Sequence, residues 1–322
     1  MLTFMIRRSL MMIPQLLLLS IVIFVLAKAM PGDAVTGAFM GNPDASPEEM
    51  EKIRDKFGLD EPWYVQYGLW IGKAVQGDFG MSYVHQQPVT TLLGSRIANT
   101  VLLSFFTLVV TYLIAIPLGI IAGRWTDSWA DKLIVTYNYF AFATPTFVFA
   151  LLMLFLFSFV LGWFPTGGSV DIRVEEGTWD YVVSKAQHLV LPVLSGAILF
   201  TFGTIQYLRN DMIDTKLKDF VKLARAKGVP ESKVYTRHIL RNSLLPIAAF
   251  LGYEITGLIA GSVFIESIFS YPGIGQLFIQ SISSRDFTVV TALVMISGAA
   301  AIVGTMLSDI ILSMVDPRIR ID

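Results

Sequence analysis

Long runs of apolar residues dominate the chain, and charged residues gather in the stretches between them. A helix needs about 20 apolar residues to cross a bilayer, because every backbone amide must be bonded internally where water is excluded. Six runs meet this requirement, so the pattern predicts an all-α polytopic membrane protein with about six spanning helices. The expected spans are Leu10–Ala27, Thr100–Ala122, Leu133–Trp163, Leu189–Leu208, Leu244–Phe269 and Phe287–Val315.

The third run is long enough to tilt or break inside the bilayer. Pro145 follows Thr144 within it and removes one helical hydrogen bond, so we expect the break at this point. Proline in a membrane helix is usually an ordinary kink, but Thr144 and Pro145 are also candidates for the translocation path or a subunit interface.

Three acidic residues fall inside or at the ends of the expected spans. Glu254 lies near the middle of the fifth, where an isolated acid is costly, so it must face protein or water. It either lines a passage or subunit interface, or is protonated or bonded to a neighbouring helix. Asp309 is expected to reach the membrane interface or pair with a basic residue such as Arg209. Glu266, near the outer end of span five, is expected to be structural or part of an outer gate.

The amino-acid composition is also that of a membrane protein. Of the 322 residues, 54% are hydrophobic and 15% charged, and the mean hydropathy is +0.63. A soluble fold could not bury so much apolar surface. The formal net charge of −1 gives no basic excess for nucleic acid, and the lack of cysteine excludes disulfides and thiolate metal sites.

Orientation follows from the distribution of Lys and Arg. With the N-terminus inside, the short segments on that side carry 15 of the 24 basic residues, in roughly half the length of the outer segments. Both termini are therefore expected in the cytoplasm. This divides the chain into residues 1–30 (N-terminus and first span), 31–99 (an extracytoplasmic domain with a helix at 46–57 and an aromatic run) and 100–322 (the core, with a cytoplasmic loop at 209–243).

The loop at 209–243 holds nine of the basic residues and reads as two helices. Gly228 and Pro230 end the first helix, and the second begins at Pro230. The first carries an apolar stripe, and the second places four residues on one side. The loop is either an anchor on lipid headgroups or a docking element for a cytoplasmic protein. The stripe is Ile213, Leu217, Phe220, Val221 and Ala224, and the second set is Val234, Tyr235, His238 and Ile239.

Residues 222–228 (KLARAKG) and 235–246 (YTRHILRNSLLP) resemble the "EAA" loop of ABC-importer permeases, in the oligopeptide, dipeptide and nickel branch. Further motifs extend the resemblance, to the first permease of such systems, over nearly the whole chain. They are Ile6-Arg7-Arg8, Pro31-Gly32-Asp33, Gly58-Leu59-Asp60, Gly77-Asp78-Phe79-Gly80, Phe264-Ile265-Glu266, Tyr271-Pro272-Gly273-Ile274-Gly275 and Asp316-Pro317-Arg318.

The resemblance implies a subunit of a type I importer in a bacterial or archaeal cytoplasmic membrane. Its expected partners are a homologous second permease, two cytoplasmic ATPase subunits and an extracytoplasmic substrate-binding protein. In such proteins the loop helix sits in a cleft of an ATPase. Lys222 and Leu223 stand where the general motif has Glu and Ala, so contacts of that acid do not transfer. The implied coupling residues are Leu223, Ala224, Arg225, Ala226, Lys227, Gly228, Val229, Tyr235 and His238.

No catalytic motif accompanies these features. The nearest fragment to a phosphate-binding loop, Gly72-Lys73, continues with Ala74, and the three histidines lie in separate segments without metal-ligand spacing. We therefore expect a non-catalytic subunit that binds no cofactor or metal, with ATP and Mg²⁺ on the partner ATPases.

Four functions compete. The leading one is import of oligopeptides or dipeptides, followed by nickel or another small solute within the same family. An ion-coupled secondary transporter would use Glu254 and Asp309 as proton carriers, but the chain shows no internal repeat of the kind such transporters carry. A membrane scaffold without transport is the fourth.

Overall fold

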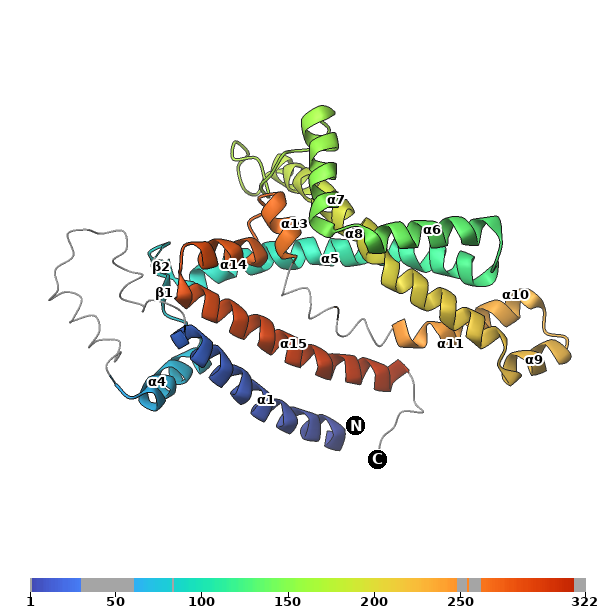
Figure 1. Cartoon of the computed structure of the whole chain (residues 1–322), viewed down its shortest axis with the longest axis horizontal. Helices are drawn as coiled ribbons and strands as arrows, with labels where there is room; N and C mark the ends of the chain where they lie inside the picture. Colours follow the sequence, from blue (N-terminus) through green and yellow to red (C-terminus); the bar gives the residue numbers. More distant parts are fainter. Residues whose placement is uncertain (1, 30–60, 83, 248–253, 255–261, 316–322) are drawn as a thin grey trace.

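The computed structural model describes residues 2–29, 61–82, 84–247, 254 and 262–315. Two long helices, α5 (Val89–Arg124) and α8 (Trp179–Lys216), lie along each other and form its centre (Figure 1). A Cβ added to Gly119 on α5 would come within 3.0 Å of Leu208 on α8. Such close approach at small residues is typical of membrane helices, which gain stability from backbone packing rather than from the hydrophobic effect.

A second pair of helices runs beside this centre. The first helix, α1 (Leu2–Ala29), packs along the last, α15 (Phe287–Val315), although the two lie at opposite ends of the sequence (Figure 1). Here too a glycine makes the contact close, because a Cβ on Gly298 would lie 2.6 Å from a methyl carbon of Leu19.

Part of the aromatic run in the expected extracytoplasmic segment packs against α1. It lies on α4 (Trp63–Val75), where the hydroxyl of Tyr67 is 2.8 Å from that of Ser20. The Tyr67 ring also meets Phe24 edge-on, with centroids 5.4 Å apart. The helix expected at 46–57 lies outside the described residues.

The third expected span is broken, as Pro145 predicts. Helix α6 (Trp129–Ala143) is followed after Thr144 and Pro145 by α7 (Thr146–Met153), and a π-helical segment, Leu154–Val160, continues α7. The two halves make an angle of 101°, so α7 stands away from the direction of α6 (Figure 1). The hydroxyl of Thr144 donates to the carbonyl of Phe140 at 2.7 Å and helps to end α6.

A short β-hairpin precedes α5 and adds a small strand pair to the helical fold. Strands β1 (Met81–Ser82) and β2 (Gln87–Pro88) are antiparallel. The hydroxyl of Ser82 donates to the carboxylate of Asp286 at 2.5 Å, and both residues are buried. Asp286 directly precedes α15, so this contact ties the hairpin to the start of the last helix.

Glu266 organises the junction between α13 (Val263–Ile268) and α14 (Ile274–Ser283). Its buried carboxylate accepts hydrogen bonds from the Thr100 hydroxyl at 2.9 Å and from the backbone N–H groups of Gly275 at 2.6 Å and Gln276 at 3.1 Å. These N–H groups belong to the first turn of α14, where a carboxylate is favoured. This geometry gives Glu266 a structural role, which is one of the two roles expected for it.

The described residues of the expected spans are mostly helical, with exceptions that include the break at Thr144 and Pro145 and residues 161–163. Within the described residues, three helices are long and apolar enough to cross a membrane, and the bent pair of α6 and α7 can form a fourth crossing. Helix α1 contains an apolar stretch at Leu10–Leu26. Most of the fifth expected span lies outside the described residues, as does the motif at 316–318. Helices α5 and α8 also extend well beyond the expected bounds, because polar residues can continue a helix once it has left the apolar layer.

Candidate functional site

The basic loop forms a folded unit at one end of α5 and α8 (Figure 1). Helix α8 runs to Lys216, past the expected start of the loop at 209, so the unit consists of residues 217–243, called the loop element below. Its first helix is α9 (Asp219–Ala226). Its second, which begins directly after Pro230 as expected, joins α10 (Glu231–Lys233), a π-helical segment (Val234–Leu240) and α11 (Arg241–Ser243).

The inner face of the loop element packs on the two central helices. Val221 and Ala224 from α9 and Val234 and Ile239 from the second helix are buried. They form one apolar cluster with side chains of α8, and residues of α5 pack against its edge. The α8 members of this cluster are Leu208 and Met212, and the α5 residues are Tyr112, Ile116 and Ile120. The loop element is therefore fixed to the helices by core packing and is not a loose tether.

The expected apolar stripe of the first helix divides into two parts. Val221 and Ala224 are buried, whereas Leu217 is 69% exposed and Phe220 39% exposed. The prediction of one continuous stripe is wrong, because α8 ends at Lys216 and α9 begins at Asp219, and the break shifts the helical phase between them.

Gly228 allows the turn between the two helices of the loop element. Its φ of +73° lies in the left-handed region that favours glycine. The Gly228 N–H bonds the Arg225 carbonyl at 2.9 Å, and the Val229 N–H bonds the Ala224 carbonyl at 3.2 Å. This pair of bonds is a Schellman motif, which ends a helix by satisfying its last carbonyls. Arg225 also forms an ion pair with Glu231 at 2.7 Å across the turn.

Tyr235 joins the loop element to the ends of both central helices. Its ring lies 4.9 Å from the guanidinium of Arg124 and 5.8 Å from the ammonium of Lys216. The same Lys216 ammonium donates to the Arg124 carbonyl at 3.2 Å and to the Thr126 hydroxyl at 3.1 Å. A cation near the last carbonyls of a helix is electrostatically favourable. Lys216 at the end of α8 therefore caps α5, and Tyr235 packs over both cations.

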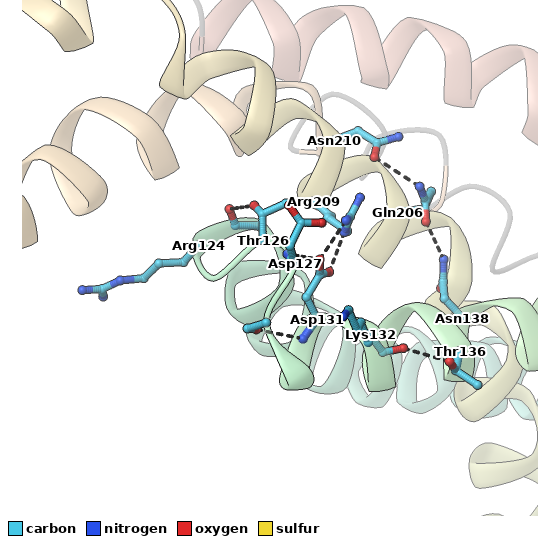
Figure 2. Close-up of polar contacts among 12 residues, drawn as sticks. Arg124, Thr126, Asp127, Asp131, Lys132, Thr136, Asn138, Gln206, Arg209 and Asn210 are labelled. Carbon is cyan, nitrogen blue, oxygen red and sulfur yellow. Dashed lines mark hydrogen bonds and ion pairs between the residues drawn. The ribbon is translucent and has the colours of Figure 1, made fainter.

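A buried ion pair ties α6 to α8 at the same end of the molecule (Figure 2). The Arg209 guanidinium donates to both carboxylate oxygens of Asp131, at 2.7 and 2.8 Å, and the Asp131 side chain is only 3% exposed. Asp131 also accepts from the backbone N–H of Asp127 at 2.8 Å. Its hydrogen bond with Arg209 lowers the pKa of Asp131 below its usual range. Arg209 is thus bonded to Asp131, and the side chain of Asp309, for which Arg209 was one suggested partner, lies outside the described residues.

Neutral polar side chains continue this contact along α6 and α8 (Figure 2). The amide of Asn138 donates to Gln206 at 3.0 Å, and the amide of Gln206 donates to Asn210 at 3.1 Å. The Tyr137 hydroxyl donates to the Ile198 carbonyl at 2.6 Å. The bonds of Asn138 and Tyr137 to α8 are partly buried and help to hold the two helices in one register.

The outer face of the loop element is the candidate coupling surface. Leu223 is 55% exposed, and Lys222, Ala226 and Lys227 are exposed around it. Among the nine implied coupling residues, Ala224 packs inward, while Val229, Tyr235 and His238 are half-buried and support the element. The structure therefore places an exposed leucine among basic side chains, on a rigidly mounted helix.

The residues considered for a passage, Glu254, Thr144 and Pro145, do not belong to residues 217–243 of the loop element. Glu254 is half-buried, and its carboxylate accepts a hydrogen bond from the Tyr112 hydroxyl of α5 at 2.6 Å. This bond to a neighbouring helix is one of the two roles expected for Glu254. Thr144 and Pro145 form the break between α6 and α7, and no hydrogen bond joins them to Glu254 in the described part of the chain.

Sequence reasoning missed three of these contacts: the pair of Asp131 with Arg209, the bond of Tyr112 to Glu254 and the tie of Ser82 to Asp286. Asp131 and Arg209 each lie at the edge of an expected span, which is a signal that they could form a pair. Nothing in the sequence selects one as the partner of the other. Among the described residues, no three His, Cys, Asp or Glu side chains are grouped to hold a metal ion.

These features define a polytopic helical membrane protein with a folded basic element at one end of its central helices. The chain belongs to the family of binding-protein-dependent transport system inner membrane components, which it matches over residues 115–321. Residues 1–104 match the N-terminal part of such membrane components.

Curated relatives match the chain over nearly its full length. It is 40% identical over 318 residues to the oligopeptide transport system permease protein AppB of Bacillus subtilis (strain 168), covering 98% of this chain and 99% of that protein. It is 32% identical over 320 residues to the glutathione transport system permease protein GsiC of Escherichia coli (strain K12), covering 99% of each.

One solved structure has a similar fold. A chain of the MetNI methionine ABC transporter, in an inward-facing conformation, matches with a TM-score of 0.55 at 14% identity. The match covers 70% of this chain and 96% of that chain, and at this identity it supports the fold alone.

Proposed function

We propose that this chain is a permease subunit of an ATP-driven importer that moves oligopeptides or dipeptides into the cytoplasm. It would work with a homologous second permease, two ATPase subunits that hold ATP and Mg²⁺, and an extracytoplasmic substrate-binding protein. The chain itself would catalyse no reaction and bind no cofactor. The family and the peptide-related names of its relatives support this proposal.

The observation that carries the mechanism is the rigid mounting of the loop element. A partner that displaces the exposed face around Leu223 would transmit the displacement to α8 through the buried contact of Val221 and Ala224 with Met212. The displacement would reach α5 through Tyr235 and through the hydrogen bond of Lys216 to the end of that helix. Close-packed interiors transmit displacement because they have little free volume. A nucleotide-driven movement of the ATPases would therefore reach both central helices together.

Orientation and passage are parts of the same proposal. The loop element and both termini would lie in the cytoplasm of a bacterial or archaeal cell, with residues 31–99 outside; the excess of basic residues supports this orientation. Glu254, held by Tyr112, would line the passage or the interface with the second permease, and the break at Thr144 and Pro145 would allow α6 and α7 to move separately.

Reconstitution tests the proposal. The chain is co-expressed with its candidate partners and purified, and ATP turnover and uptake are measured in vesicles. We expect co-isolation with a second permease and ATPases, and uptake of a labelled peptide that unlabelled peptides reduce and Ni²⁺ does not. A lone chain with proton-coupled uptake would contradict the proposal. Competition by Ni²⁺ and not by peptides would indicate that the cargo is nickel instead of peptide.

The coupling face has a matched test. Leu223→Ser should lower transport-coupled ATP turnover without loss of membrane insertion, because Leu223 faces out of the chain. Val75→Ser is the control, since Val75 on α4 is 79% exposed and lies outside the loop element. Equal turnover in the two variants would reject the assignment of this face.

A further inference from the structure

An open apolar groove lies between the middle of α5 and the N-terminal half of α8. Its volume is about 460 Å³, within the range of small-molecule sites. Leu102, Phe106 and Val110 form one wall, with the i, i+4, i+8 spacing of a single helix face. The opposite wall comes from α8 and includes Ala186, Leu189, Val190 and Val193.

The residues that line the groove include one charged side chain, Lys185. Its ammonium lies 5.7 Å from the centroid of the ring of Tyr181, which also lines the groove. Across the ranges that the structure describes, Lys185 forms no ion pair with a carboxylate. An amphipathic ligand with an anionic end at Lys185 and an apolar end along the walls would match this distribution.

The depth of the groove in the bilayer points to the kind of ligand. Lys185 precedes Leu189, the first residue of the expected fourth span, by four residues, which is about 6 Å along a helix. The ammonium would therefore lie at headgroup level and the apolar walls within the hydrocarbon layer. The wall from Leu102 to Val110 extends about 12 Å into that layer.

We propose that this groove binds one phospholipid of net negative charge, with its phosphate at Lys185 and one acyl chain between α5 and α8. A lysine ammonium is a compact charge suited to phosphate, and the Tyr181 ring holds it at the mouth. The bound lipid would cover apolar surface of the central helix pair. The site depends on the membrane placement of these helices but not on the transported cargo.

Native mass spectrometry of the transporter, purified with its partner subunits from vesicles of equal phosphatidylglycerol and phosphatidylcholine, tests this site. We expect one retained lipid per copy of this chain, with phosphatidylglycerol preferred. Lys185→Gln should reduce that preference about fivefold, the effect of one basic residue near an anionic headgroup. Lys185→Arg should retain it. An unchanged preference in Lys185→Gln would overturn the proposal.

A second pair of variants tests the groove itself. Ala186→Trp should fill the groove and abolish lipid retention, whereas Gln187→Trp, one residue further on the same exposed turn and outside the lining, should leave it intact. Equal retention in the two would refute the site. Efficient cross-linking of Ala186→Cys to the second permease by a reagent that joins thiols to amines would show that a protein helix occupies the groove and would also overturn the proposal. Lipid retention is measured without any transport reaction. A failure of this prediction can therefore be distinguished from a failure of the proposed import function.

Discussion

The ion pair between Arg209 and Asp131 gives a direct test of how α6 is held to α8. Arg209→Met keeps much of the aliphatic stem but removes the two N–H groups that reach the Asp131 carboxylate at 2.7 and 2.8 Å. The carboxylate is nearly inaccessible to water and would retain only the N–H of Asp127 as a donor. We therefore expect the charge on Asp131 to be left largely uncompensated.

The expected loss is large for a single substitution. Removing one partner of a buried ion pair usually costs about 3–5 kcal/mol, because the remaining charge stays buried. The Arg209 side chain is 18% exposed, so water can partly replace it, and about 3 kcal/mol is the better estimate. Adding Asp131→Asn removes the orphaned charge. The double variant should therefore be more stable than the sum of the two losses predicts, by about 2 kcal/mol.

Chemical unfolding of the purified protein in detergent, for the wild type, both single variants and the double variant, measures this coupling. Arg173→Met is the matched control, because the Arg173 side chain in its pair with Asp171 is 84% exposed. Exposed pairs contribute little, so this variant should unfold like the wild type. Strictly additive losses for Arg209→Met and Asp131→Asn would refute the reasoning.

The same pair predicts a pH dependence. Arg209 lowers the pKa of Asp131 below its ordinary value of 3.8, so folding favours the ionised carboxyl. The resulting stabilisation is complete above that ordinary value and is lost as the pH falls through the folded-state pKa. The difference in stability between the wild type and Arg209→Met should therefore be largest near pH 7 and shrink as the pH falls into the range where carboxyl groups take up protons. A difference unchanged at pH 3 would contradict the assignment.

Three further substitutions follow from local geometry. Gly228→Val should abolish coupled ATP turnover in reconstituted complexes, whereas Gly228→Asn, which tolerates positive φ, should retain most of it; unchanged turnover in the valine variant would reject the docking assignment. Gly273→Ala should destabilise by about 2 kcal/mol in thermal unfolding, because its Cβ would overlap the Glu266 carboxyl, while Gly72→Ala in open space should be neutral or stabilising. Tyr112→Phe should cost about 1–3 kcal/mol by removing a donor to Glu254; no loss would mean that the carboxyl has another partner.

Local features of the sequence determined most elements of the fold. Hydropathy located the spans, because the energetic need for about 20 apolar residues acts along one continuous segment. Pro145 marked the break in the third span, since its missing N–H is a property of that residue alone. Gly228 and Pro230 separated the two helices of the loop element for the same reason.

Only the tertiary structure decided which residues meet. Asp131 and Arg209 lie 78 positions apart and are paired because α6 folds back along α8. Ala224 and Leu223 are neighbours in one helix, yet one packs on α8 and the other is exposed. The phase shift between α8 and α9 and the 101° angle at Pro145 likewise depend on packing around the chain. Residue propensities act over a few positions, whereas partners are selected by atoms that only folding brings together.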